Sequence, residues 1–321
     1  MSCSYLVAFK RIHLIIDALA EITNVSETGS PGAAGSLERS MEMGLEILED
    51  MGMRHPWKGH VEPFRMIGNL YFVGTVPASS HLIDTGGGLL LLDTGLPQSV
   101  YLILEGIRRL GFDPSDIRWI VHSHGHYDHL GGTRAIAELT GARTYIGRPD
   151  APLASGEQDL TWARELGAQF YEAFEPDVLI DDGDVLHFGN TNMECLLTPG
   201  HSLGTLTMFW NIEGADRPLT AAMHGGTGQN TLAADWLRSH GMPLSIRDEF
   251  RAGLRRVRDR HVDVVVGNHV GHNGTLEKAA LLKRNPAANP FVDPTEWKRF
   301  LLDTERSLDE MLAREGTPGI S

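Results

Sequence analysis

The feature that most constrains this chain is a short loop rich in histidine. Residues 124–129 read HGHYDH and directly follow a run of apolar residues that predicts a β-strand. In an extended loop, His124 and His126 point the same way and can hold one metal ion. Asp128 and His129 come after a turn and can face a second ion. Imidazole nitrogen and carboxylate oxygen suit zinc, so the loop predicts two Zn2+ ions per chain. The alternative is a solvated histidine-rich loop that binds no ion.

One loop cannot complete two coordination shells, so ligands from distant segments are required. His201 lies in a tight turn, TPGHS, after a predicted strand. His269 and His272 lie in a second turn, VGNHVGHN, after the last predicted strand. Between these two we favour His269 as a ligand, because the turn at residues 267–268 would aim it. His272 is then a hydrogen-bond donor behind the ligands or a residue at the rim of the site.

Outside these loops, short apolar runs alternate with helical patterns. Runs typical of strands occupy residues 69–73, 81–84, 89–93, 117–121, 144–146, 185–187, 193–197, 205–210, 219–223 and 262–266. Helical spacing of apolar residues occupies residues 37–51, 102–110, 133–140, 162–174, 246–258, 275–283 and 294–313. Two groups of strands bracketed by helices predict an α/β fold with two sheets face to face and helices outside.

Both ends of the chain are predicted to lie outside the catalytic domain, which we place at residues 61–290. Residues 1–60 form an N-terminal appendage that contains a Gly- and Ser-rich linker at residues 23–36. Residues 291–321 form a C-terminal helical extension. Its apolar stripe, which includes Trp297, either packs on the core or meets a partner subunit, and core packing is the commoner use.

Charge and cysteine content limit the partners of the chain. A net charge of -14 repels nucleic acid and anionic membranes, which leaves a small molecule as the expected substrate. No apolar run reaches the roughly 20 residues of a membrane span. Two cysteines cannot form a disulfide framework, and Cys195 is expected to be a small buried hydrophobe. Lys10 and Arg11 interrupt the apolar residues at the start of the sequence. We therefore predict that this segment is not a signal peptide and expect a cytoplasmic protein. A periplasmic location and a homo-oligomer both stay open.

These motifs resemble those of the metallo-β-lactamase superfamily over roughly residues 64–273. Its HxHxDH motif is matched at residues 124–129, its single later histidine by His201 and its final histidine by His269. Four further segments look like the B3 subclass: NLYFVGT, SSHLI, LLDTG and GFDPSDI. The resemblance implies an αββα sandwich of two mixed sheets. It also implies a first zinc on His124, His126 and His201, and a second on Asp128, His129 and His269.

The resemblance also suggests roles around the metals. Asp93, in the DTG element, would brace the histidine loop from below. Many superfamily members carry a bridging aspartate after the strand at residues 219–223, where this chain has His224 and no carboxylate. The B3 enzymes also lack that aspartate. His224 is then a substrate contact, an extra ligand or a histidine bonded to backbone, and Tyr127 is a cleft wall or a catalytic phenol.

The remaining segments of interest are candidate cleft residues and two charged runs. Residues 157–159, Trp162 and Trp236 lie where they could line the cleft. The charged runs at residues 255–260 and 309–310 are expected to be solvated helix faces.

The function implied by the resemblance is hydrolysis of a cyclic amide, most specifically a β-lactam, by a metal-bound hydroxide. Asp128 and His201 would carry the catalytic roles, with Asp128 orienting the hydroxide. The expected absence of an export signal counts against a β-lactam. The alternative is therefore a cytoplasmic hydrolase of another lactone, ester or amide, with at most incidental β-lactamase activity. An iron-dependent oxidoreductase on the same fold ranks below both.

Overall fold

The computed structural model describes residues 50–165, 167–168 and 172–316. Backbone contacts divide the chain into one unit that ends at Gly59 and another that starts at His60. The described part of the first unit is a π-helix, Asp50–Arg54, and a 3-10 helix, Pro56–Gly59. The linker and nearly all of the helix predicted at residues 37–51 lie outside the described residues. The second unit contains both β-sheets and the histidine loop.

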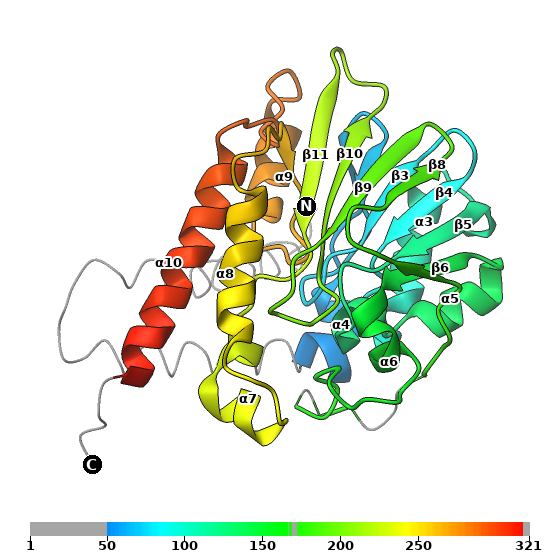
Figure 1. Ribbon diagram of the computed structural model, residues 1–321. Coiled ribbons are helices and arrows are strands. Elements are labelled where there is room, and N and C mark those ends of the chain that lie inside the picture. The colour runs from blue at the N-terminus through cyan, green and yellow to red at the C-terminus, as the bar shows by residue number, and fades with distance from the viewer. Residues whose placement is uncertain (1–49, 166, 169–171, 317–321) are drawn as a thin grey trace. The chain divides into compact units, whose positions relative to one another are not determined.

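Two β-sheets form the centre of this unit (Figure 1). The first has the order β1-β2-β3-β4-β5-β6-β7, with strands Phe64–Ile67, Leu70–Phe72, His81–Asp84, Leu89–Leu92, Ile117–Val121, Arg143–Gly147 and Val178–Ile180. The second has the order β12-β11-β10-β9-β8, with strands Val185–Phe188 (β8), Thr191–Leu197 (β9), Leu206–Ile212 (β10), Leu219–His224 (β11) and Val264–Val265 (β12). Neighbours from β4 to β7 are parallel, as are β11 and β12, and the other pairs are antiparallel. Both sheets are therefore mixed.

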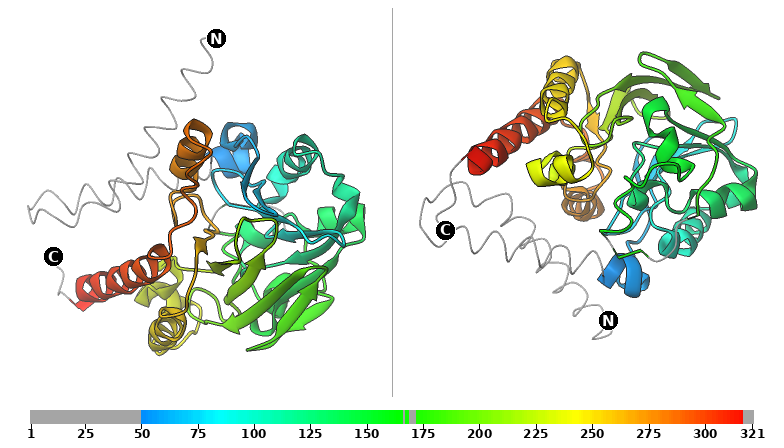
Figure 2. Two further views of the ribbon diagram at one scale, coloured as in Figure 1. Left: turned by 90° about the horizontal axis from the view of Figure 1, so that it is seen from above. Right: turned by 60° about the horizontal axis from the view of Figure 1, so that its bottom comes forward.

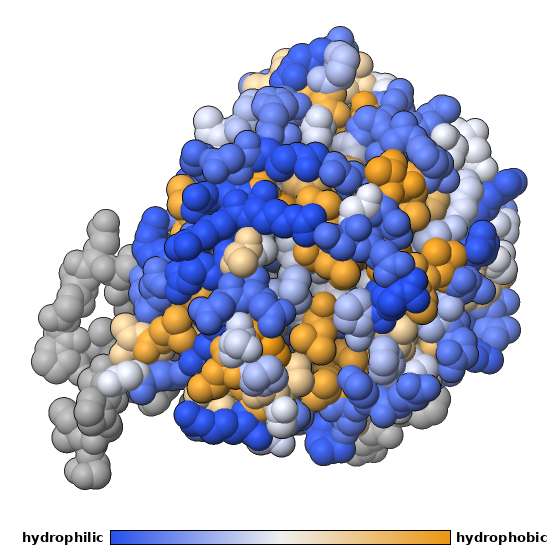
Figure 3. Space-filling model, in the orientation of Figure 1, coloured by the Kyte–Doolittle hydropathy of each residue, from blue (hydrophilic) through white to orange (hydrophobic). Residues whose placement is uncertain are grey.

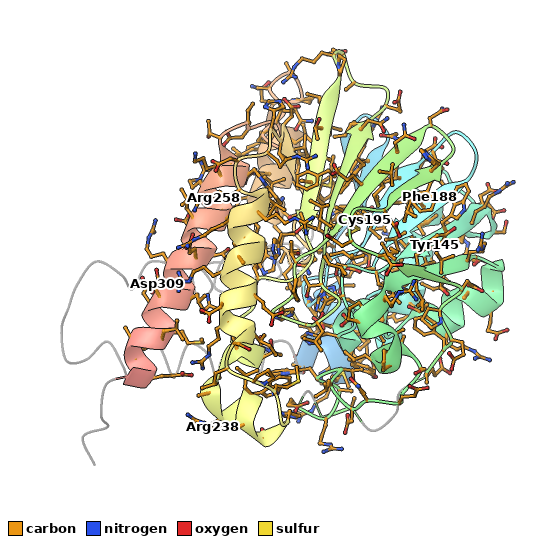
Figure 4. All side chains as sticks on the ribbon, viewed as in Figure 1. Tyr145, Phe188, Cys195, Arg238, Arg258 and Asp309 are labelled. Atoms are coloured by element: carbon orange, nitrogen blue, oxygen red, sulfur yellow. The ribbon has the colours of Figure 1, made fainter. Side chains whose placement is uncertain are left out.

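The main core fills the space between the two sheets. Phe72 and Leu90 of the first sheet and Met208 of the second belong to one buried cluster. Cys195 belongs to it as well, and burial raises the pKa of its thiol to about 12, so it behaves as the expected small hydrophobe. Figure 4 shows Cys195 close to Phe188 and Tyr145, whose rings meet edge to face at 5.3 Å. Side chains along a strand alternate between the two sides of a sheet, so the apolar residues at alternate positions gather on the inner face of each sheet.

Helices cover the outer face of each sheet, which completes the predicted αββα sandwich (Figure 2). On the first sheet lie α3, Val100–Arg109, and α5, Thr133–Thr140, which ends at Gly141 with a left-handed φ of 72°. On the second lie α8, Ile246–Val257, and α10, Glu296–Gly316. The remaining helices are α4 (Tyr127–Leu130), α6 (Ala151–Ala154), α7 (Ala234–Ser239), α9 (Thr275–Arg284) and four 3-10 turns at Pro97–Ser99, Pro114–Asp116, Arg148–Asp150 and Asn230–Leu232. Within the described part of the chain, no helix is both long and apolar enough to cross a membrane.

One prediction about a helix is wrong. The described residues of the segment 162–174 form turns and irregular backbone instead of a helix. Trp162 and Gly167 have φ values of 65° and 73°, which a right-handed helix cannot contain. The charged run at residues 255–260 is largely exposed, as predicted, but it also takes part in ion pairs. Three arginines of α8 and its end converge on one buried carboxylate, Glu305 of α10: Arg251 at 3.2 Å, Arg255 at 2.6 Å and Arg258 at 3.1 Å. Arg258 and Asp309 are labelled on these helices in Figure 4.

The C-terminal helix packs on the core, as the commoner interpretation expected. Trp297, Leu301 and Leu308 are buried against the second sheet and α8, and the Trp297 indole donates to the Val257 carbonyl at 2.9 Å. Phe209 meets the same indole edge to face at 5.7 Å.

We therefore expect Trp297→Ala to lower the free energy of unfolding by about 3 to 5 kcal/mol, because it leaves a large cavity in the core. Urea denaturation followed by circular dichroism measures this change. Leu302→Ala, on the exposed side of the same helix, is the control and should cost less than about 1 kcal/mol. Equal losses for the two variants would contradict the packing of α10 on the core.

Candidate metal centre

The histidine loop joins the end of β5 to helix α4. Strand β5 stops at Val121, and the backbone stays extended at His126 (φ -82°, ψ 154°) before α4 begins at Tyr127. Asp128 and His129 thus lie in the first turn of a short helix, where the sequence predicted only a turn. The backbone changes from extended to helical inside the motif. The side chains before and after this change therefore point in different directions, and each half of the motif can bind a different ion.

The first cluster contains His124, His126 and His201, whose ligand atoms lie within 4.8 Å of one another. The ring of His201 is 4.7 Å from that of His124 and 4.4 Å from that of His126. The Nδ1 of His201 donates to the carbonyl of Gly228 at 2.8 Å, which leaves its Nε2 as an acceptor. All three rings are buried, so the cluster is a closed set of three nitrogen ligands.

The second cluster contains Asp128, His129 and His269 and meets the same 4.8 Å limit. His269 donates from Nδ1 to the carbonyl of Pro77 at 2.9 Å. Its Nε2 lies 3.2 Å from the Nε2 of His129 and 3.5 Å from the Asp128 carboxylate. The structure thus brings His269, and not His272, into the cluster.

Asp93 connects the two clusters from beneath. Its carboxylate accepts hydrogen bonds from the backbone N–H and the hydroxyl of Ser123, both at 2.7 Å, and from Nδ1 of His129 at 2.9 Å. The Ser123 hydroxyl in turn accepts from Nδ1 of His124 at 3.0 Å. Asp93 has a left-handed φ of 57°, an unfavourable backbone conformation for a residue with a side chain. One fully buried carboxylate therefore fixes the orientation of a histidine in each cluster.

Burial keeps the imidazoles of the first cluster neutral. Burial, with the neighbouring histidines, holds the pKa of His124 well below its usual range, and burial lowers the pKa of His201 to about 4. In the second cluster burial also opposes the charged form of His129, but Asp128 and Asp93 outweigh it and raise its pKa to about 10. Because metal ions bind neutral imidazoles, the first cluster is already in the binding form, whereas His129 would release a proton when an ion binds at the second cluster.

The hydrogen bonds around the clusters test whether metal ions fit. His129 and His269 both donate from Nδ1, so their Nε2 atoms, 3.2 Å apart, are the ring nitrogens left to bind a metal ion. Without an ion, the raised pKa of His129 places a proton between these two nitrogens, and a metal ion would take the place of that proton. The Nε2 of His124 is buried and has no hydrogen-bond partner among the described residues. A buried unpaired acceptor costs about 1 to 3 kcal/mol, a cost that a metal ion would remove. The residues present therefore fit two metal ions.

The remaining candidate residues surround the clusters without joining them. His224, at the end of β11, is buried, and its Nε2 has no hydrogen-bond partner in the described part of the chain. The described residues place no carboxylate there, since two glycines follow it. His272 faces the hydroxyl of Thr227 at 3.4 Å, and its ring lies 5.0 Å from that of His269. Tyr127 is fully buried under the loop, and burial raises the pKa of its phenol.

A pocket opens beside the first cluster. Its lining includes His126 and His201, and its other walls are largely apolar: Leu153, Leu160, Leu203, Trp236, Leu237 and Met242. Of the residues suggested for the cleft, Gln158 and Trp236 line this pocket, whereas Glu157, Asp159, Trp162 and Tyr127 do not. Asp150, also in the lining, was missed because no motif marks it.

The fold and the site can be compared with known proteins. Residues 73–214 match the family model described as the metallo-beta-lactamase superfamily. Among curated proteins, the chain is 27% identical over 157 residues to a probable metallo-hydrolase of Bacillus subtilis, a match that covers 44% of this chain and 56% of that protein. It is 26% identical over 161 residues to an N-acyl homoserine lactonase of Bacillus thuringiensis, covering 43% and 60%. The matches thus span less than two thirds of these relatives.

Solved structures match more of the chain. BJP-1, a subclass B3 metallo-beta-lactamase of Bradyrhizobium japonicum, is 29% identical with a TM-score of 0.71, over 81% of this chain and 96% of that one. FEZ-1, a metallo-beta-lactamase from Legionella gormanii, is 27% identical with a TM-score of 0.73, over 81% and 98%. The sandwich of two mixed sheets seen here is the fold of these structures.

Proposed function

Because the chain belongs to the metallo-beta-lactamase superfamily, we propose that it is a zinc-dependent hydrolase that opens a cyclic amide, most specifically a β-lactam. The observation that carries the proposal is the pair of adjacent clusters, one of three histidines and one of two histidines and an aspartate. Imidazole and carboxylate ligands in this number suit zinc. The likeness to subclass B3 structures over four fifths of the chain supports the choice of substrate.

Zinc held by the residues of the two clusters would supply a nucleophile at neutral pH, because it lowers the pKa of bound water to about 7, and it would polarise the carbonyl of the substrate. The residues of the protein position the water and the substrate. Asp128 lies in the second cluster with its side chain still partly exposed, so it can orient a water on the solvent side. The rings of His124 and His201 are buried, so they contact little bulk water. No protein base is required in this arrangement.

The apolar pocket suggests where the rest of the substrate binds. It adjoins His126 and His201, so a group placed in it would lie next to the reacting bond. Figure 3 shows apolar patches low in the view, in the region of α6 and α7. We therefore infer that the preferred substrate carries an aromatic or alkyl substituent beside the bond that is cleaved.

A second candidate is hydrolysis of a lactone. It is favoured by the match to an N-acyl homoserine lactonase and by the apolar pocket, which would also accept an acyl chain. The residue at the end of β11 counts against it, because His224 stands where many superfamily members carry a bridging aspartate.

A direct assay separates the two candidates. The zinc-loaded protein is tested with a chromogenic cephalosporin and with a panel of lactones and esters, and His124→Ala is tested in parallel to detect contaminating enzymes. We expect turnover of the cephalosporin that is lost in the variant. Lactone opening without cephalosporin turnover would replace the first candidate with the second, and no turnover of any substrate by the loaded protein would contradict both.

The pocket leads to a prediction about Trp236, whose ring is held by stacking on His240 at 4.2 Å. We expect Trp236→Ala to raise KM about tenfold for a substrate with an aromatic substituent and to change kcat less than about threefold. The reason is that the lost apolar contact stabilises the bound substrate and the transition state equally. Steady-state kinetics with a paired substrate that carries only a methyl group provides the control. A similar rise in KM for both substrates would argue against the pocket as the binding site of the substituent.

A further inference from the structure

Asp150 lies outside every sequence motif, at the end of the 3-10 turn Arg148–Asp150 that follows strand β6. Its side chain is fully buried. No Lys or Arg of the described residues lies within ion-pair distance of it. A buried carboxylate without a cation is costly unless hydrogen bonds satisfy it, so the partners of Asp150 indicate what the residue does.

Three short hydrogen bonds satisfy the carboxylate. One oxygen accepts from the backbone N–H of Gly125 and from the hydroxyl of Ser202, both at 2.6 Å. The other oxygen accepts from the backbone N–H of Gly204 at 2.6 Å. Gly125 stands between His124 and His126, and Ser202 directly follows His201. The same carboxylate thus holds both loops that build the first cluster.

The packing around Asp150 leaves little freedom to these loops. A Cβ atom on Gly204 would lie 2.6 Å from the Asp150 carboxyl carbon, and one on Gly125 would lie 3.1 Å from its Cβ. Strand β6 also approaches the second loop closely, since a Cβ on Gly147 would lie 2.2 Å from the carbonyl oxygen of Gly204. The loops therefore meet Asp150 through glycine backbone, and a shift of the carboxylate would move them.

We propose that Asp150 is a positioning residue that fixes the His124–His126 loop and the His201 loop relative to each other, so that three histidines can hold the first metal ion. This inference rests on the proposed function. The first cluster then depends on two buried carboxylates: Asp93, which reaches one histidine in each cluster, and Asp150, which joins the two loops of the first cluster.

Asp150→Asn tests the proposal, because the amide keeps the shape of the side chain but points N–H groups at donors. Metal-free protein is titrated with cobalt(II) in competition with a chelator, and the absorption of bound cobalt reports the geometry of each site. His201→Ala identifies which of the two binding steps belongs to the first cluster. The matched control is Asp263→Asn: this aspartate is 2% exposed and accepts from Thr220 and Arg217 at 3.0 Å, but it contacts neither loop.

We expect Asp150→Asn to weaken the first-cluster step about 10- to 100-fold and to alter its cobalt spectrum, while the second step stays within about threefold. Asp263→Asn should leave both steps unchanged even if it lowers the melting temperature. Ser202→Ala, which removes one of the three hydrogen bonds, should weaken the same step by a smaller factor. This variant replaces Asp150→Asn in the test if Asp150→Asn fails to fold.

Two results would overturn the assignment of Asp150. The first is unchanged binding in Asp150→Asn and Ser202→Ala. The second is equal weakening in the Asp150 and Asp263 variants, which would reduce Asp150 to general stability. A wild-type protein that takes up no metal in this titration would instead contradict the proposed function itself.

Discussion

Replacing His201 with alanine should lower kcat/KM by at least about a thousandfold and reduce bound zinc from two ions per chain to one. The first cluster would keep only His124 and His126, which are too few ligands for a stable zinc site. A metal ion contributes several kcal/mol of charge stabilisation in the transition state, and each 1.4 kcal/mol is about tenfold in rate. Steady-state kinetics and metal analysis of the same purified sample measure both effects.

The control for this variant is His187→Ala. His187 lies on β8 at the surface, where it contacts only the side chain of Asn192 at 2.6 Å among the hydrogen bonds of the described residues. Its removal should leave activity and zinc content at wild-type values. A His201→Ala variant that keeps full activity would show that the first cluster does not take part in the reaction.

Asp93→Asn is expected to weaken metal binding at the second cluster about 10- to 100-fold, with a matching loss of activity at limiting zinc. The amide can place only one acceptor against three donors, two on Ser123 and one on His129. Asparagine tolerates the left-handed φ of 57° at this position, so the backbone is not the cause of the effect. Zinc titration against a competing chelator measures the affinity.

Asp177→Asn is the matched control, because Asp177 also accepts from a backbone N–H and a hydroxyl, those of Thr144, both at 2.8 Å. Asp177 accepts no hydrogen bond from a histidine among the described residues. If both variants bind zinc like the wild type, Asp93 does not orient the ligands. If excess zinc fails to restore activity to Asp93→Asn, the residue has a role beyond metal affinity.

The sequence was most informative where local patterns decide the structure. Helix α5 was predicted at its observed bounds, because Gly141 ends it with a φ that other residues avoid. The strand before the histidine loop was also correct. The helix predicted at residues 162–174 was wrong. The apolar spacing of this segment resembles that of a helix, but Trp162 adopts a positive φ that helix propensities do not predict. Strands β1 and β7 were missed because they are short and their burial depends on neighbours in the sheet.

The two clusters were predictable because histidine and aspartate at this spacing have a chemistry that few uses other than metal binding require. The six ligand candidates chosen from the sequence are the six that the structure groups into two clusters. Asp150 could not be found in this way. Its partners lie 25 and 52 to 54 residues away, and two of them are backbone N–H groups that any sequence contains. The convergence of arginines on Glu305 was missed for the same reason, since it depends on how α8 and α10 meet.

The metal content of the purified protein tests the central claim most directly. After loading with zinc and extensive dialysis, elemental analysis by mass spectrometry should give close to two zinc ions per chain, one for each cluster. His201→Ala should give close to one in the same measurement. Retention of iron in preference to zinc, or the absence of any bound metal in the wild-type protein, would contradict the account.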